Sequence, residues 1–470
     1  MNKKLIGIIL LVALVASGLT GAAHAAPPKK YYYGPCDYDS KIPKEWAPLQ
    51  NYMFGMNECL GPVKVVPAKL TSTKPKTKIS AAQTLTSLET CKIKNDPNTY
   101  RTRAFPNSSQ EEMSKWRTHP GPNTTIQVVP IFTPDAQVQP GSTPQKDYGK
   151  YFKFLTDYFR YASDGPSTFK IRVPDSYVEF PKALTQYTIT HHASQEQQEK
   201  QRALGREIIS AVDSKIDFAG ADMVLVVVPA ETKFNVMEQG GLGFAEADGQ
   251  QLRLMSFGEQ YTLSDAIKNN RGFMAPMWWM HELYHIGTGL EDHNGSNYWQ
   301  NMRSTDPKEP GMGNWGLMSM SKTELTTWEK WLIGLTMDSQ VRCSAMNAAS
   351  THWLVPSSVK STKSKLLVVP ISETKVVVVE SIRAAGLNYM LPKESEGALV
   401  YTVDTSIADS EYGFKVISGS KKPISRQPFI LSDAPLKKGQ SVVIEGIKIT
   451  NVEWGEFGDV IKVEPSTSGK

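Results

Sequence analysis

The chain has 470 residues, of which 40% are hydrophobic, and this length suffices for two or three folded domains. Its formal net charge is only +5, and its 52 lysine and arginine residues form no basic block. Neither a nucleic-acid partner nor an anionic membrane partner is therefore expected.

The first 25 residues have the pattern of a secretory signal peptide. Lys3 and Lys4 precede an unbroken apolar run from Leu5 to Val15, and Ala23-His24-Ala25 fits the small-x-small cleavage pattern. The run is shorter than the roughly 20 residues that span a bilayer, and no later run approaches that length. We therefore expect cleavage near Ala25, secretion to the periplasm or the extracellular space, and no stable membrane insertion.

The four cysteines are Cys36, Cys59, Cys91 and Cys343. Thiols of an exported chain tend to oxidise, so an even number predicts two disulfides rather than metal ligands. Three connectivities are possible, and we favour Cys36 with Cys59 and Cys91 with Cys343. The alternative is that Cys91 ligates a metal ion in a latent form.

Residues 26–95 are rich in Pro, Lys, Thr and Tyr, and within them 62–78 has the composition of a linker. They fit a propeptide or a wrapped N-terminal extension equally well. A region of alternating strands and helices follows, which indicates an α/β layer. We predict strands at 126–132, 168–173 and 223–228, and helices at 147–161 and 195–216; the aromatic stripe from Tyr151 to Tyr161 is interpreted as core.

A His-Glu-x-x-His motif follows at His281, Glu282 and His285. On a helix, histidines four residues apart lie on one face, so both imidazoles can reach one metal ion, while Glu282 lies one residue round the helix. The motif can arise by chance and its histidines can be ordinary core residues. However, the surrounding segment is apolar nearly all round, and burying such groups unpaired is costly. Metal ligation accounts for both observations.

We therefore predict a catalytic Zn²⁺ site. Zinc held by two or three side chains keeps a position open for water, lowers the pKa of that water to about 7 and polarises a carbonyl under attack. Glu282 is predicted to be the general base, which takes the proton of the water and passes it to the leaving amine.

Two segments after the motif are predicted to complete the site. The helix should end near Gly287, where glycines suit a C-terminal cap. Three consecutive candidates for a third zinc ligand then follow, namely Glu291, Asp292 and His293. Further on, Met318 lies in a glycine-flanked turn and is interpreted as a floor under the site. An amphipathic segment follows at 324–334.

The order of these blocks resembles the immune inhibitor A-like secreted zinc metallopeptidases, a metzincin-like family. The blocks are 281–285 (HELYH), 289–292 (GLED), 315–319 (WGLMS), 328–334 (WEKWLIG), 377–383 (VVVESIR), 391–392 (LP) and 397–404 (GALVYTVD). The resemblance covers roughly residues 126–404. It implies an α+β fold in which a mixed sheet and an active-site helix form the catalytic domain and a β-rich segment follows. It also implies that His281 and His285 ligate zinc, that Glu282 is the general base and that Met318 forms the turn beneath the metal.

One departure from the family pattern concerns the third ligand. The family places a glycine three residues after the second histidine and an aspartate ligand three residues further on, but here those positions hold Thr288 and Glu291. A slip of one residue restores Gly289 and Asp292. We therefore prefer Asp292 as the third ligand, followed by Glu291 and then by His293.

From about residue 352 the chain alternates as strands do, which predicts a β-sandwich-like C-terminal region. The expected strands are 366–369, 376–379, 398–403, 441–444, 447–452 and 460–463. This region either binds a ligand or only stabilises the molecule. Asp292, Asn294 and Asn297 form an oxygen-rich turn without EF-hand spacing, so no calcium site is predicted.

The sequence as a whole predicts a secreted zinc metalloendopeptidase that acts on proteins or peptides without a covalent enzyme intermediate. The expected divisions are a signal peptide (1–25), an N-terminal extension or propeptide (26–95), a catalytic domain (96–345) and a β-rich domain (346–470). One alternative is a zinc hydrolase of a non-peptide amide. Another is a secreted binding protein whose degenerate metal site is purely structural.

Overall fold

The computed structural model describes residues 65–81, 85–95, 101–105, 123–189, 194–232, 236–237, 240–257, 275–293, 311–320, 323–389, 391, 393–408, 411–423 and 431–466. The expected signal peptide, Cys36, Cys59, Asn294 and Asn297 lie outside these residues. The described part combines helices with several sheets, which confirms the predicted α+β class. It includes no helix that is both long enough and apolar enough to cross a bilayer.

The first sheet has six strands in the order β2-β1-β4-β6-β5, and β3 pairs with β1 beside β2. All its pairings are parallel except that of the edge strand β5 with β6. The central strand β4 is buried along its whole length, as its run of apolar residues predicts for a parallel strand covered on both faces. The strands are β1 (Thr125–Phe132), β2 (Lys170–Arg172), β3 (Val178–Glu179), β4 (Met223–Val227), β5 (Gly240–Ala247) and β6 (Gln250–Phe257).

Helices cover both faces of this sheet. The side chains of α5 (Pro144–Ala162) and α8 (Ala275–Thr288) share one hydrophobic cluster with β1, β4 and β6, whereas α6 (Gln195–Val212) packs on the opposite face. In the aromatic stripe of α5, Tyr151 stacks on Trp279 of α8 with ring centroids 4.9 Å apart. The stripe therefore belongs to the core, as predicted, and packs against α8.

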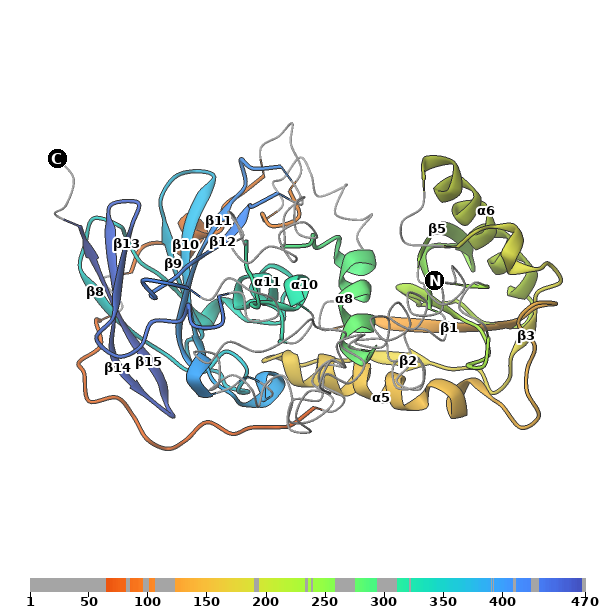
Figure 1. The fold of residues 1–470 in the computed structure, drawn as a ribbon, viewed down its shortest axis with the longest axis horizontal. Helices are drawn as coiled ribbons and strands as arrows, with labels where there is room; N and C mark the ends of the chain where they lie inside the picture. Colours follow the sequence, from red (N-terminus) through yellow and green to blue (C-terminus); the bar gives the residue numbers. More distant parts are fainter. Residues whose placement is uncertain are drawn as a thin grey trace, which may run out of the picture.

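Two short helices lie between α8 and the C-terminal sheets (Figure 1). They are α10 (Leu317–Met320) and α11 (Thr327–Leu332). A capping box starts α11, because the Thr326 side chain accepts a hydrogen bond from Glu329 N–H while the Glu329 carboxylate accepts one from Thr326 N–H. Trp328 and Trp331 of α11 then pack against the nearer C-terminal sheet.

Two sheets form the C-terminal part, with strand orders β12-β11-β10-β9-β7 and β13-β14-β15-β8. Their facing side chains share one hydrophobic cluster, in which Val377 and Val379 of β10 join Ile461 and Val463 of β15, so the two sheets pack as layers. The strands are β7 (Val341–Cys343), β8 (Ser350–Leu354), β9 (Leu366–Pro370), β10 (Lys375–Ile382), β11 (Gly397–Asp404), β12 (Phe414–Ile417), β13 (Ser441–Ile444), β14 (Ile447–Gly455) and β15 (Gly458–Pro465). Strand β7 precedes the expected domain boundary at residue 345.

Within the described residues, the remaining helices are single turns that connect these elements. They are α3 (Leu88–Cys91) and the 3₁₀ helices η7 (Leu184–Gln186), η9 (Asp338–Gln340), η10 (Gly386–Asn388) and η11 (Lys393–Ser395).

The described parts of the N-terminal region, residues 65–81 and 85–95, lie along the rest of the protein (Figure 1). The Ala68 N–H donates a hydrogen bond to the Tyr161 hydroxyl of α5 at 2.9 Å, and the Thr77 N–H donates one to the Glu453 carboxylate of β14 at 2.8 Å. The composition of 62–78 indicates a linker, yet the described residues from 65 onward are docked, because their backbone donors find partners on both halves of the molecule.

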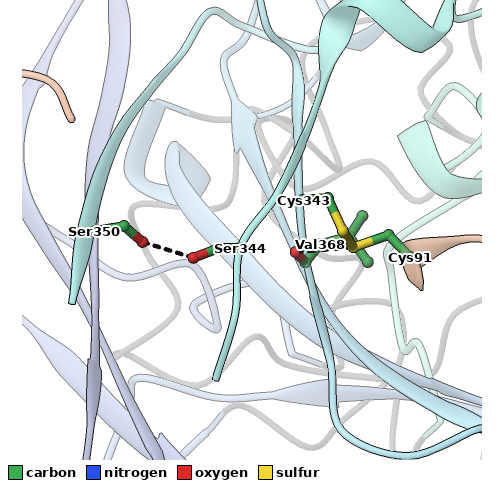
Figure 2. Close-up of a disulfide and its surroundings, with 5 residues drawn as sticks. All are labelled: Cys91, Cys343, Ser344, Ser350 and Val368. Carbon is green, nitrogen blue, oxygen red and sulfur yellow. Dashed lines mark hydrogen bonds between the residues drawn. A yellow bond between two sulfur atoms is a disulfide. The ribbon is translucent and has the colours of Figure 1, made fainter. Parts of the chain in front are cut away.

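A disulfide joins α3 to strand β7 at the end of this docked segment. The sulfur atoms of Cys91 and Cys343 are 2.05 Å apart, and Figure 2 shows the bond beside Val368 of β9. The predicted pairing of Cys91 with Cys343 is confirmed. Cys91 is consequently not a metal ligand in this structure.

Candidate metal centre

The two histidines of the motif meet on the buried helix α8. Their Nε2 atoms lie 2.8 Å apart, and their rings are nearly perpendicular at 84°. The spacing of four residues places both imidazoles on one face of the helix, as the sequence predicts. His281 is almost fully buried, whereas the side chain of His285 is 25% exposed.

A backbone carbonyl orients each imidazole ring. The Nδ1 atom of His281 is 2.9 Å from the Leu317 carbonyl oxygen, and that of His285 is 2.5 Å from the Leu290 carbonyl oxygen. Because a carbonyl oxygen only accepts hydrogen bonds, both Nδ1 atoms carry the proton. In the neutral rings the two Nε2 lone pairs then face the same point, which is the second-shell arrangement of metal-ligating histidines.

Asp292 completes a three-residue cluster with the two histidines. Its Oδ1 atom is 3.2 Å from Nε2 of His281 and 3.3 Å from Nε2 of His285. A tetrahedral zinc ion with bonds of about 2.0–2.1 Å separates its ligand atoms by about 3.3 Å. Two imidazole nitrogens and one carboxylate oxygen are also ligand types that zinc accepts. The two Asp292 distances match the separation around zinc, whereas the two Nε2 atoms, at 2.8 Å, lie closer together than bound zinc would hold them.

The electrostatics of the cluster favour a positive charge between its members. Burial alone would lower the pKa of His285, but the Asp292 carboxylate outweighs it and raises that pKa to about 9. Partial desolvation opposes ionisation of Asp292, although its side chain is 51% exposed, yet the two histidines hold its pKa well below the usual range. Three ligand atoms so close together therefore attract a cation, whether a proton or a metal ion.

The other two candidates for the third ligand have different partners. The Glu291 carboxylate is engaged by the Arg103 guanidinium, at 2.5 Å from Nε to Oε1 and 2.8 Å from Nη2 to Oε2. The Nε2 atom of His293 lies 2.6 Å from Oε1 of Glu329. Of the three consecutive candidates, Asp292 is therefore the one that the structure brings to the histidines.

The remaining predicted site residues lie close by in the fold. Glu282 is buried on α8, one residue after His281, and is not part of the three-residue cluster. Met318 is fully buried and shares a hydrophobic cluster with α8 residues, while its carbonyl accepts a hydrogen bond from His293 N–H at 2.9 Å. The preceding residue, Leu317, supplies the carbonyl that orients His281.

A glycine shapes the turn that contains Met318. Gly316 has φ +88°, a conformation that L side chains rarely adopt, and an added Cβ would lie 3.1 Å from the Thr326 side chain. This turn holds the Leu317 carbonyl against His281. The predicted glycine-flanked turn is therefore a structural support of the cluster.

Sequence reasoning missed Arg103 and Glu329 as partners of the segment after α8. Arg103 precedes Glu291 by 188 positions, and Glu329 follows His293 by 36 positions. Neither pair has a spacing that a sequence motif records. The capping-box pattern at Thr326 and Glu329 was a local signal for the helix start, but not for the contact with His293.

Comparison with protein-family models gives no match, and comparison with curated proteins gives none either.

Proposed function

We propose that the protein is a secreted zinc-dependent endopeptidase with a metzincin-like catalytic domain. The observation that carries this proposal is the convergence of His281 Nε2, His285 Nε2 and Asp292 Oδ1 on one point, next to the buried Glu282. The resemblance of the sequence blocks to secreted zinc metallopeptidases supports the same function. The mixed sheet beside α8, with its antiparallel edge strand β5, supports this function as well.

A bound zinc ion would supply Lewis acidity toward a peptide carbonyl and a water of lowered pKa. His281, His285 and Asp292 would hold it, and the carbonyls of Leu317 and Leu290 keep the two rings in the tautomer that ligates through Nε2. Glu282 accepts a proton from the water whose oxygen attacks the peptide carbonyl carbon, and it delivers that proton to the leaving nitrogen as the C–N bond breaks, which releases the amine.

The exposure of the cluster favours catalysis over a purely structural metal site. Structural zinc sites are usually closed by four protein ligands, whereas catalytic sites keep one position open. Here the side chain of Asp292 is 51% exposed and that of His285 is 25% exposed, so the cluster is reached from solvent on that side. A zinc hydrolase of a non-peptide amide would use the same residues, and cleavage assays on both kinds of substrate distinguish the two activities.

The Glu282→Ala variant tests this function. The purified chain should hold about one zinc ion and cleave a mixed peptide library, and the variant should retain the zinc while losing about 10²–10⁴-fold in rate, the usual contribution of a general base. Glu246→Ala, which removes an exposed glutamate from β5, is the matched control and should keep both properties. Full activity of Glu282→Ala would refute the proposed base, and loss of its zinc would place Glu282 among the ligands.

A further inference from the structure

Arg103 is a fully buried arginine that pairs with Glu291, the residue before the proposed third ligand Asp292. Its side chain is 0% exposed, that of its partner Glu291 is 5% exposed, and the two are joined by parallel hydrogen bonds of 2.5 and 2.8 Å. Such a bidentate pair fixes direction as well as distance. Arg103 therefore determines where the Glu291 side chain points.

The rest of the guanidinium is held by backbone carbonyls at the end of β11. Nη1 donates to the carbonyl oxygens of Asp404 at 2.8 Å and Ile407 at 3.1 Å, and Nη2 donates to that of Ala408 at 3.0 Å. Gly413 leaves space for this arrangement, because a Cβ there would lie 1.4 Å from Nη1. These carbonyls hold the guanidinium in place, and its bonds to Glu291 anchor the segment after α8.

The residue before Glu291 contacts the three-residue cluster, and the residue after it belongs to the cluster. The Leu290 carbonyl accepts the hydrogen bond of His285 Nδ1–H, and Asp292 supplies the carboxylate that faces the histidines. Adjacent residues of a non-helical segment point in different directions, so holding Glu291 on Arg103 helps to turn Asp292 toward the histidines. Removing Arg103 would take both of its hydrogen bonds from the buried Glu291 carboxylate, which favours a shift of the Glu291 segment.

We propose that Arg103 is a positioning residue of the metal site, which acts through Glu291 to hold Asp292 as third ligand and keeps Glu291 itself off the metal. This inference rests on the proposed zinc site.

The chain offers a matched buried pair in the C-terminal sheets, between the end of β10 and strand β15. Arg383 is buried, its Nη1 lies 2.8 Å from Oδ2 of Asp459, and its other donors bind the backbone carbonyls of Gly455 and Gly458. Losing this arginine removes a similar carboxylate pair and similar carbonyl contacts. A change in zinc affinity confined to Arg103 therefore separates positioning from general loss of stability.

The experiment measures the zinc dissociation constant of the full chain by competition with a chelating dye. Arg103→Gln should weaken zinc binding by about 10–100-fold, as changes in the residues around metal ligands typically do. Arg383→Gln should destabilise the protein in urea and leave the zinc dissociation constant at the wild-type value. The inference is overturned if Arg103→Gln binds zinc like the wild type, or if both variants lose zinc affinity equally.

Two further variants keep the test decisive where Arg103→Gln fails to fold. Arg103→Lys keeps the charge but cannot engage both Glu291 oxygens together with the carbonyls, so its zinc affinity should still fall measurably. Glu291→Gln breaks the pair from the other side and should give a similar loss, and the Arg103→Gln, Glu291→Gln double variant should be no worse than either single variant. Wild-type affinity in both Arg103→Lys and Glu291→Gln overturns the inference, whereas a wild-type chain that binds no zinc refutes the proposed function itself.

Discussion

At the scale of single residues, the segment after α8 shows how three neighbours acquire three different partners. Asp292 faces the histidines, Glu291 pairs with Arg103, and His293 pairs with Glu329. The motif predicts the histidines because their spacing matches the helical period. It does not identify the third ligand, because the residues that pair with Glu291 and His293 lie far from them in the sequence.

Substitution of these three neighbours tests the ligand assignment. Asp292→Ala should lower zinc affinity more than about 100-fold, because it removes a ligand outright and not merely a supporting contact. Glu291→Ala and His293→Ala should lower it less, because their side chains bind Arg103 and Glu329. Zinc content after dialysis against a weak chelator measures the order. The assignment is wrong if Glu291→Ala or His293→Ala loses its zinc while Asp292→Ala retains it.

At the scale of elements, the predicted periodicities recover most helices and strands close to their bounds. The strand predicted at 441–444 is β13, and the helix predicted at 195–216 is α6, which ends at Val212. The hairpin of β5 and β6 was not predicted. Gly243 has φ +76° beside a β-bulge, and a Cβ there would lie 2.8 Å from the Arg202 side chain of α6. Glycine permits that close approach but gives no hydrophobic pattern to read.

The junction between α11 and β10 contains a buried carboxyl group with an altered pKa. Glu380 of β10 accepts hydrogen bonds from Thr327 N–H at 3.3 Å and from the Thr327 hydroxyl at 2.5 Å. Burial raises the pKa of Glu380 to about 7. The hydrogen bonds from Thr327 oppose this rise, and the negative charge of the nearby Glu324 adds to it. Between pH 4.5 and about 7, the Glu380 carboxyl is therefore protonated in the folded protein but ionised in the unfolded chain.

This pKa predicts a pH-dependent difference between the wild type and Glu380→Gln. The pKa of Glu380 in the folded protein lies above the ordinary value of 4.5. Protonated Glu380 therefore makes its full contribution to the free energy of unfolding below pH 4.5, and this contribution is lost as pH rises through about 7. From pH 5 to pH 8 the stability of Glu380→Gln relative to the wild type should rise by about 2–3 kcal/mol, at 1.36 kcal/mol per pKa unit. Urea unfolding at both pH values measures it. A constant difference for Glu380→Gln would contradict the prediction.

At the scale of the whole molecule, the N-terminal region links the two halves. Between its contacts with Tyr161 of α5 and Glu453 of β14, the chain runs along the outside of the C-terminal sheets, and the disulfide then fixes it to β7 (Figure 1). Composition did not reveal this docking. The donors at Ala68 and Thr77 are backbone N–H groups, which every residue except proline has, so no side-chain pattern marks them.

Removing the Cys91–Cys343 disulfide should lower the stability of the protein and leave the metal site in place. The bond closes a loop between residues 252 positions apart, and loss of a native disulfide typically costs about 2–5 kcal/mol of unfolding free energy. The position of Arg103 does not depend on the disulfide alone. The Trp328 indole N–H donates a hydrogen bond to the Arg103 carbonyl at 2.9 Å, and the Arg103 guanidinium donates hydrogen bonds to the Asp404 carbonyl and the Glu291 carboxylate. The variant with both Cys91→Ala and Cys343→Ala should therefore unfold at lower urea concentration but bind zinc as tightly as the wild type.

Urea unfolding and dye competition on the same preparations of this double-alanine variant check both halves of the prediction. The comparison uses substitution rather than a thiol reductant, because reductants themselves bind zinc through their thiolates. In the wild type, a thiol reagent added after denaturation should find neither Cys91 nor Cys343 reactive. Unchanged stability of the variant would show that the docked segment needs no covalent link. A loss of zinc affinity as large as that of Arg103→Gln would show instead that the disulfide, and not the contacts of Arg103 itself, places the arginine.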